Sequence, residues 1–501
     1  MSLAVIHSRA QVGIEAPPVT VEVHLAGGLP SLSIVGLPET AVKESKDRVR
    51  AALQNSGFEF PARRITISLA PADLPKDGGR FDLPIALGIL AASGQVSARD
   101  LERYEFLGEL SLGGDLRGGG GVLPAALAVA DAGRRLVVPA EDAGEAALIK
   151  DGECFAADSL LQVCHHLNGA EALPVAQPIS GQGHGEPPPD LADVRGQRQA
   201  RRALEIAAAG GHNLLLVGPP GTGKTKQASR LPGILPPMAD REALEAAAVE
   251  SITGRRIDPA NWRRRRFRAP HHTASGVALV GGGPQPRPGE ISLAHNGVLF
   301  LDELPEFDRR VLEVLREPME SGTITISRAA RQAEFPARFQ LIAAMNPCPC
   351  GYAGDSRDAR CRCTPDQIQR YRGRVSGPLL DRIDLQIYVP RLPTSALSDD
   401  QARPENSVAV RKRVSEARER QAARGPLANA AVDDRHLHEC CRLSHRDQRL
   451  LDQAVDKLSL STRGARRILR VARTIADLSG RESIDTADLT EAIGYRRMNL
   501  G

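Results

Sequence analysis

The chain has 501 residues, which is enough for about three domains. Its 42% hydrophobic and 25% charged residues are ordinary for a globular protein, and a net charge of +4 is too small to identify a polyanionic partner. No apolar run reaches the length of a membrane span, and the first residues lack the pattern of a signal peptide. These properties argue against a membrane partner and predict a cytoplasmic protein.

The first third of the chain mixes two apolar periods. Residues 19–25 and 65–69 alternate as half-buried strands do, whereas residues 41–53 have helical spacing. Mixed strands and helices predict an α+β domain over residues 1–175. The Gly/Pro-rich piece that follows, residues 176–190, has no apolar period and is expected to be a linker.

A phosphate-binding loop follows an apolar strand at residues 213–217. The loop fits G-x-x-x-x-G-K-[ST], and a helix is expected to begin at Lys224. Backbone N–H groups of such a turn surround a polyphosphate, Lys224 reaches its β- and γ-phosphates, and the Thr225 hydroxyl binds Mg²⁺. The expected ATP-binding residues are Gly218, Pro219, Pro220, Gly221, Thr222, Gly223, Lys224 and Thr225.

Two further apolar strands end in polar side chains. Residues 297–301 lead to Asp302 and Glu303, and residues 339–345 lead to Asn346. Asp302 is expected to hold Mg²⁺ together with Thr225, Glu303 to polarise the attacking water, and Asn346 to orient that water against the γ-phosphate. The alternatives are an ordinary strand end for the acidic pair and a turn-forming Asn-Pro pair at Asn346.

The ATPase core is expected over residues 191–392, and the chain becomes helical over residues 393–501. Apolar residues at helical spacing predict helices at residues 408–424, 447–458 and 463–478.

Four of the eight cysteines form two C-x-C pairs, and a loop rich in Gly, Asp and Arg separates the pairs. In a reducing compartment such pairs suggest a metal before a disulfide, and four thiolates suit a structural Zn²⁺. Four reduced thiols in a turn are the alternative. The expected zinc ligands are Cys348, Cys350, Cys361 and Cys363, while Cys154, Cys164, Cys440 and Cys441 are expected to be ordinary thiols.

These motifs together resemble an AAA+ ATPase of the magnesium-chelatase-like clade, and within it the ComM/YifB family. The resemblance covers essentially the whole chain and also includes Ser33–Pro38, Arg268–Thr273, Asn346–Gly351 and Ser376–Arg382. It implies a multidomain α/β protein with a Lon-protease-like N-terminal α+β domain, an AAA+ P-loop core and a C-terminal helical lid.

The resemblance also implies a function. ComM/YifB proteins are associated with homo-hexameric, ATP-dependent motors that act on branched or single-stranded DNA, and with branch migration in recombination and natural transformation. The alternative is a chelatase-like or MoxR-like ATPase that remodels a protein or a metal-insertion partner. Stimulation of ATP hydrolysis by DNA would distinguish the two.

Residue roles follow from the same resemblance. Arg382 resembles the arginine finger that reaches the γ-phosphate of a neighbouring subunit; the alternative is a surface ion pair with Asp381 or Asp384. Arg463 resembles the second sensor arginine at the start of the lid helix, with Arg466 and Arg467 as the alternatives. Val194–Gln197 resembles the segment that lines the adenine pocket.

Two inserts interrupt the core. Residues 271–289, rich in Gly and Pro, are similar to the helix-two insert of the clade, and residues 323–335 are expected to form a hairpin. Similar hairpins in ring ATPases point into the pore, where Arg328 and Arg331 would contact phosphates. A solvated hairpin is the alternative.

The N-terminal domain resembles a Lon-type protease without its catalytic pair. Residues 75–80 are similar to the segment that carries the catalytic serine, and residues 120–133 to the segment that carries the lysine. Arg80 and Leu123 stand at those two positions, and neither supplies a nucleophile or a base. The chain is therefore expected not to be a protease.

Overall fold

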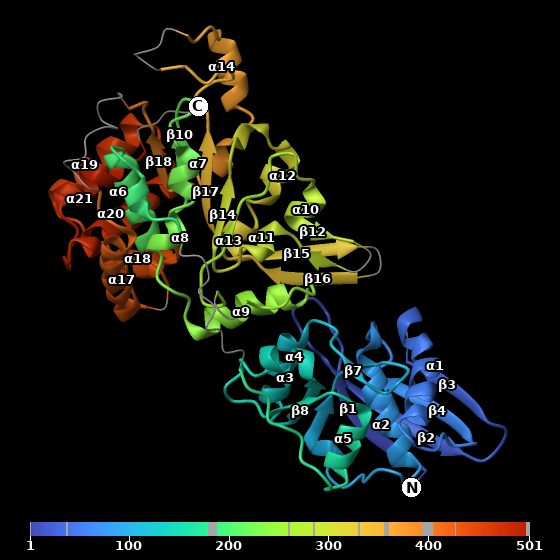
Figure 1. The fold of residues 1–501 in the computed structure, drawn as a ribbon. Coiled ribbons are helices and arrows are strands. Elements are labelled where there is room, and N and C mark those ends of the chain that lie inside the picture. Colours follow the sequence, from blue (N-terminus) through green and yellow to red (C-terminus); the bar gives the residue numbers. More distant parts are fainter. Residues whose placement is uncertain are drawn as a thin grey trace. The chain divides into compact units, whose positions relative to one another are not determined.

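The computed structural model describes residues 2–36, 39–178, 188–258, 261–283, 286–328, 331–354, 360–392, 404–425 and 427–496. The chain divides into two compact units (Figure 1). Unit 1 comprises Met1–His184, Leu244–Trp262 and Ser327–Phe335, and unit 2 comprises Gly185–Ala243, Arg263–Ile326 and Pro336–Gly501. Two segments from the middle of the chain thus belong to the N-terminal unit, which the sequence did not predict. Most of the expected linker and the Leu37-Pro38 pair lie outside the described residues.

Unit 1 is built on a mixed seven-stranded sheet with the order β3-β4-β2-β1-β5-β8-β9. Strand β2 pairs antiparallel with both β1 and β4, and the remaining neighbours run parallel. The strands are β1 Leu3–Arg9, β2 Pro18–Ala26, β3 Ser31–Val35, β4 Arg64–Ala70, β5 Tyr104–Phe106, β8 Arg135–Pro139 and β9 Cys154–Ala157, with a separate pair β6 Glu109–Leu110 and β7 Leu116–Arg117. The mixture of strands and helices expected for this region is observed.

The helices of unit 1 are α1 Thr40–Asn55, α2 Asp82–Ala92, α3 Val122–Asp131, α4 Ala140–Ala146 and α5 Leu160–Leu167, with short 3₁₀ turns η1 Gly79–Phe81 and η2 Leu101–Arg103. Helix α9 Asp240–Ser251 begins in unit 2 and belongs to unit 1 from Leu244 onward. Every residue of α2 is buried, and α2 packs on β1 and β2. The helix can be buried on all sides because apolar residues occupy all of its faces. A second core lies around α3, α4 and β8, and α9 contributes Ala247 and Ala248 to it. The fold of unit 1 therefore includes part of α9.

Unit 2 contains a parallel five-stranded sheet with the order β11-β14-β17-β10-β18. Its strands are β10 Leu214–Val217, β11 Phe267–Arg268, β14 Val298–Leu301, β17 Gln340–Met345 and β18 Leu385–Tyr388. Leu214 faces Ile342 of β17 on one side and Leu385 of β18 on the other. Because the strands are parallel, their carboxyl ends meet at one edge of the sheet and their amino ends at the opposite edge.

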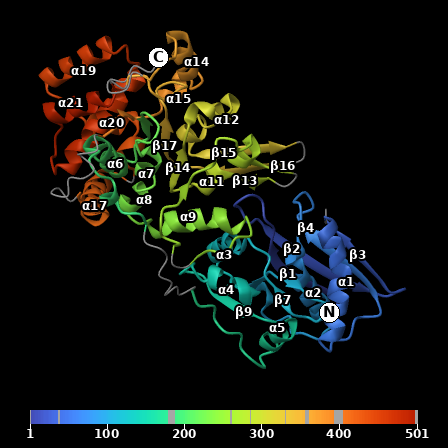
Figure 2. The same ribbon diagram turned by 45° about the horizontal axis from the view of Figure 1, so that its top comes forward.

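Helices cover this sheet and form the C-terminal part of unit 2. They are α6 Arg198–Gly210, α7 Lys224–Ala228, α8 Leu231–Ile234, α10 Gly276–Val280, α11 Glu290–Leu293, α12 Arg309–Val314, α13 Pro318–Ser321, α14 Pro365–Arg372, α15 Gly377–Leu380, α17 Ser407–Arg424, α18 Asp434–Cys440, α19 His445–Lys457, α20 Thr462–Leu478 and α21 Thr486–Gly494, with η3 Leu191–Asp193, η4 Leu304–Glu306 and η5 Asn429–Ala431. Helices α17 and α20 pack against α6, and α20 packs against α21 (Figure 2). The three helices expected in this part of the chain are confirmed.

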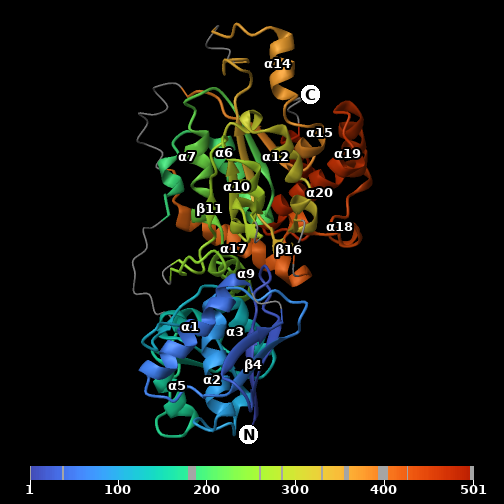
Figure 3. The ribbon, with the colours of Figure 1, turned by 90° about the vertical axis from the view of Figure 1, so that its right-hand side faces the viewer.

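Some elements lie outside the five-stranded sheet. The expected hairpin is present as β15 Thr323–Arg328 and β16 Arg331–Pro336. Helix α14 projects beyond the sheet of unit 2 (Figure 3). The helix-two insert, residues 271–289, contains α10 and a short pair of strands, β12 Gly281–Gly282 and β13 Arg287–Pro288, and α11 follows it directly. None of the helices in the described part of the chain is long and apolar enough to cross a membrane.

Candidate functional site

The phosphate-binding loop leaves the sheet at the carboxyl end of β10. Gly221 and Gly223 adopt positive φ angles of 77° and 80°, a left-handed conformation that glycine takes without steric cost. Gly218 is required for another reason, since a Cβ atom there would lie 2.3 Å from the carbonyl oxygen of Val389. The loop thus turns tightly into α7 and leaves a cradle lined by backbone, as phosphate binding needs.

Lys224 lies inside this loop. Its buried Nζ donates hydrogen bonds to the carbonyl oxygens of Gly218 and Pro219 at 2.7 and 3.0 Å and to Oδ1 of Asn346 at 3.1 Å. Burial lowers the pKa of Lys224, and the carboxylates of Asp302 and Glu303 oppose that shift. Two predicted site residues, one at the start of α7 and one directly after β17, are therefore in direct contact.

The acidic pair follows β14 at the same edge. Thr225 Oγ1 donates to Oδ2 of Asp302 at 2.5 Å, so the two expected Mg²⁺ ligands already point toward one another. A hydroxyl and a carboxylate oxygen are the hard ligands that Mg²⁺ prefers, and together with the glycine cradle they fit Mg²⁺–ATP.

Glu303 differs from its neighbours in backbone conformation. Its φ is +53°, which is strained for a residue with a side chain and is often found at functional sites. Its Oε2 lies 3.0 Å from Nδ1 of His272. Sequence reasoning did not place His272 beside the acidic pair, because the two are distant in the chain and only the fold brings them into contact.

Arg382 lies at the opposite edge of the sheet. Its backbone carbonyl accepts a hydrogen bond from Asn213, the residue before β10, whereas the phosphate loop follows the other end of that strand. Its guanidinium donates to Oε1 of Glu320 at 2.5 Å and to the carbonyl oxygen of Pro378 at 2.7 Å. Burial lowers the pKa of Arg382, and Glu320 opposes that shift. The structure does not bring Arg382 to the phosphate loop of its own chain.

Arg463 joins Arg382 at this edge. Its Nη2 lies 2.8 Å from the same Glu320 oxygen, so one carboxylate on α13 holds both predicted arginines. The ion pair of Arg382 with Asp381 or Asp384 that was the alternative is not the one formed; Asp384 pairs with Arg467 at 2.5 Å instead. Sequence reasoning missed Glu320, because nothing in its local pattern marks it.

An open cavity of about 790 Å³ adjoins this pair of arginines. Seven arginines and three acidic residues line it. They are Arg265, Arg338, Arg418, Arg463, Arg466, Arg467 and Arg470, with Glu320, Asp384 and Asp434. The excess of positive charge suits an anionic ligand or partner surface at this edge.

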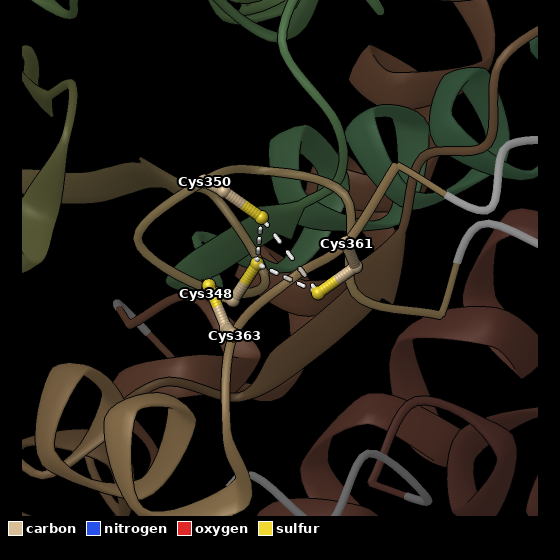
Figure 4. Close-up of side chains that lie close together, drawn as sticks. All are labelled: Cys348, Cys350, Cys361 and Cys363. Carbon is tan, nitrogen blue, oxygen red and sulfur yellow. Dashed lines mark hydrogen bonds between the residues drawn. The ribbon is translucent and has the colours of Figure 1, made fainter.

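The four cysteines of the C-x-C pairs converge after β17 (Figure 4). All four Sγ atoms lie within 4.8 Å of one another. The remaining thiols lie apart from them: burial raises the pKa values of Cys154 and Cys164 in unit 1 to about 12, and Cys440 adjoins Cys441 in α18.

Comparison with known proteins finds three matching family models and relatives of similar length. Residues 190–397 match the family described as magnesium chelatase, subunit ChlI, residues 21–142 match subunit ChlI of Mg-chelatase, and residues 404–496 match the ChlI C-terminal family. The chain is 53% identical to the competence protein ComM of Haemophilus influenzae over 502 residues, with 99% of this chain and 98% of that protein covered. It is 51% identical to YifB of Escherichia coli over 499 residues, with 100% and 98% covered.

The chain belongs to the ComM/YifB family. Members are magnesium-chelatase-like AAA+ ATPases, so the phosphate loop and the acidic pair lie in a fold that implies ATP hydrolysis. A more distant relative is the chloroplastic magnesium-chelatase subunit ChlI of Chlamydomonas reinhardtii, which is 25% identical over 222 residues, 43% of this chain and 46% of that protein.

Other predicted residues of this ComM/YifB-family chain are only partly described. Of the adenine-pocket segment, Val194 is buried and Gln197 Nε2 donates to the carbonyl oxygen of Pro390 at 2.8 Å. In the hairpin, Ala333 and Phe335 are buried near Gly13 of unit 1. The side chains of Arg328 and Arg331 lie outside the described part of the structure.

The two segments that resemble the Lon-type protease segments contact each other. Arg80 Nη2 donates to the carbonyl oxygen of Gly120 at 3.2 Å, and Leu123 is buried. The described residues that line the small cavity there include Arg80, Glu109 and Asp142 but no Ser, Thr or Cys.

Proposed function

We propose that this protein is an ATP- and Mg²⁺-dependent motor that assembles as a ring and acts on DNA as a branch-migrating helicase. Membership of a magnesium-chelatase-like AAA+ family supports the ATPase part of this proposal. Full-length similarity to a protein named for competence supports a role connected with DNA.

The proposal of a ring is supported by one observation, the separation of the predicted site residues into two groups. At the carboxyl edge of the sheet Lys224 contacts Asn346 and Thr225 contacts Asp302. At the amino edge Arg382 and Arg463 both bind Glu320. Strand β10 separates the two groups and spans about 13 Å. Each chain thus offers two incomplete halves, and head-to-tail association would complete one site at every interface; such contacts close into rings.

In the completed site each residue has a separate task. Lys224 and the loop N–H groups would bind the β- and γ-phosphates, while Thr225 and Asp302 would hold Mg²⁺, which neutralises developing negative charge on the phosphates. Glu303 and Asn346 would orient the attacking water. Arg382 of the neighbouring subunit would stabilise the transition state, a contribution on the order of 10³–10⁵ in rate.

The hairpin supplies the proposed DNA contact. Arg328 and Arg331 flank its tip, and the ring would place several copies of the tip together. Arginine contacts with phosphates give binding that does not depend on sequence and weakens steeply with salt. Such contacts suit a motor that must move along any DNA.

The proposal is tested by the rate of ATP hydrolysis with and without a four-way DNA junction, over a series of salt concentrations. DNA should stimulate hydrolysis, and the double variant Arg328→Ala, Arg331→Ala should lose that stimulation while its basal rate is kept. The matched double variant Arg99→Ala, Arg103→Ala removes the same charge from an exposed turn of unit 1 and should keep the stimulation. Absence of DNA binding at moderate salt would favour the chelatase-like or MoxR-like remodelling activity instead.

A further inference from the structure

We propose that Cys348, Cys350, Cys361 and Cys363 bind one Zn²⁺ ion and that this metal centre braces the phosphate-binding loop. The metal assignment rests on the cysteines alone. The bracing of the loop rests also on the proposed ATPase site. The two parts are tested separately.

The sulfur geometry fits zinc. A tetrahedral Zn²⁺ with Zn–S bonds of about 2.3 Å requires its sulfur atoms to lie about 3.8 Å apart. The Sγ of Cys348 lies 3.3 Å from that of Cys350 and 3.8 Å from that of Cys361, and Cys350 and Cys361 are 3.7 Å apart. Cys363 completes the set within 4.8 Å of every member. The four thiols thus already occupy the corners that the ion needs.

The surroundings suit a bound thiolate rather than a disulfide. The backbone N–H of Ala353 points at Sγ of Cys348 at 3.3 Å, the kind of outer contact that holds a metal-bound sulfur in place. All four cysteines are free thiols, and four sulfur ligands leave Zn²⁺ no open position for substrate. The centre is therefore structural. On binding, each thiol releases its proton to solvent, and no oxidant is required.

The centre is joined to the ATP site through the segment that precedes it. Cys348 follows Asn346 by two residues, and Asn346 Oδ1 accepts from Lys224. Gly351, with φ +88°, packs so closely on the loop that a Cβ atom there would lie 2.7 Å from Cδ of Pro220. A fixed Cys348–Cys350 turn would therefore hold both Asn346 and the loop.

The second C-x-C pair is fixed on its other side. Thr364, directly after Cys363, caps α14 with a complete capping box. At the end of α14, Arg372 Nε donates to the carbonyl oxygen of Pro347 at 3.2 Å. The chain thus returns to the segment between Asn346 and Cys348, so the metal closes a loop whose two ends are already anchored.

The metal is tested on the purified full-length protein by elemental analysis. One zinc per chain is expected, and Cys350→Ser or Cys361→Ser should lose it. Cys440→Ser, which removes a thiol that has a single cysteine neighbour, should keep it. Replacement of the zinc by Co²⁺ should give the absorption of a tetrahedral four-thiolate site. Zinc-free wild-type protein, iron in place of zinc, or full zinc retention in both variants would overturn the assignment.

The bracing is tested by Gly351→Ala. This variant keeps all four ligands, so zinc should remain at one per chain, while the added Cβ displaces Pro220 and lowers kcat for ATP hydrolysis by about tenfold or more. The zinc-depleted Cys361→Ser variant should show a similar loss. Normal hydrolysis in both would refute the bracing and leave the metal assignment intact. If wild-type protein binds zinc but hydrolyses no ATP, the proposed function fails while the zinc site stands.

Discussion

Asp384 ties the C-terminal helices to the edge of the sheet that carries Arg382. Its Oδ1 pairs with Arg467 of α20 at 2.5 Å, and its Oδ2 accepts from the backbone N–H of Asn213 at 3.0 Å. Only 2% of the Asp384 side chain and 13% of the Arg467 side chain are exposed. Asp384→Asn leaves the Arg467 charge buried without its partner, which typically costs 3–5 kcal/mol. Since the amide still offers one acceptor oxygen, we expect about 3 kcal/mol.

The loss of stability can be measured by urea unfolding, and the position of the single tryptophan provides an internal control. Its one tryptophan, Trp262, belongs to unit 1, so Trp fluorescence in a urea titration reports unit 1, whereas far-UV circular dichroism reports both units. The variant should lower the urea midpoint of the dichroism transition of unit 2 by about 1 M and leave the fluorescence transition unchanged. Asp434→Asn removes an exposed partner of Arg466 and should cost less than about 1 kcal/mol. If Asp384→Asn and Asp434→Asn lowered the urea midpoint by the same small amount, the argument from the buried ion pair would be contradicted.

The same pair predicts a dependence on pH. Burial alone would raise the pKa of Asp384, but Arg467 and the His212 imidazole, whose Nδ1 lies 3.5 Å from Oδ2, outweigh it and hold the pKa well below its usual range. A depressed folded-state pKa gives stability that is present above the unfolded value of about 3.9 and is lost as the pH falls through the folded value. The difference between wild type and Asp384→Asn should therefore be full at neutral pH and shrink in acid. A difference that grows in acid would reverse the sign of the argument.

Three further outcomes follow from the site. Glu303→Gln should bind ATP with near-normal affinity, measured with a fluorescent analogue, but hydrolyse it at least about 100-fold more slowly, because the water loses its polarising carboxylate; unchanged hydrolysis would exclude Glu303 from that role. Gly218→Ala should weaken ATP binding, because its Cβ meets the Val389 carbonyl, whereas Gly57→Ala, in an open turn of unit 1, should leave binding unchanged; equal affinities would contradict the close-packing argument. The purified protein should not degrade casein in the presence of ATP, since Arg80 and Leu123 cannot form a nucleophile and base; robust ATP-dependent cleavage would contradict the assignment.

Local patterns in the sequence were sufficient for much of the ATP site. Strands β10, β14 and β17 are short, fully buried and parallel, so each consists mainly of a continuous apolar run. Asp302 follows β14, Asn346 follows β17, and the glycine-rich loop follows β10. The glycine pattern of the loop depends only on neighbouring residues. For these reasons the strands that present Lys224 and Asp302 could be predicted without knowledge of the fold.

Contacts between distant residues could not be predicted in this way. Glu320 meets Arg382 and Arg463 from a four-residue helix, and these pairs join residues far apart in the chain. The packing of α9 in unit 1 likewise depends on alanines whose partners lie in α3 and α4. Both features arise from tertiary packing, to which helical period and residue type give no guide.

Mixing two inactive variants tests the shared site most directly. Lys224→Ala removes the phosphate-binding half, and Arg382→Ala removes the finger, so each protein alone should hydrolyse ATP very slowly while Arg382→Ala still binds nucleotide. In mixed rings an intact Arg382 from one variant would meet an intact Lys224 from the other. Since random equal mixing pairs intact halves at about a quarter of the interfaces, hydrolysis should recover toward about one quarter of the wild-type rate. No recovery at any mixing ratio, or normal hydrolysis by Arg382→Ala alone, would contradict a site shared between subunits.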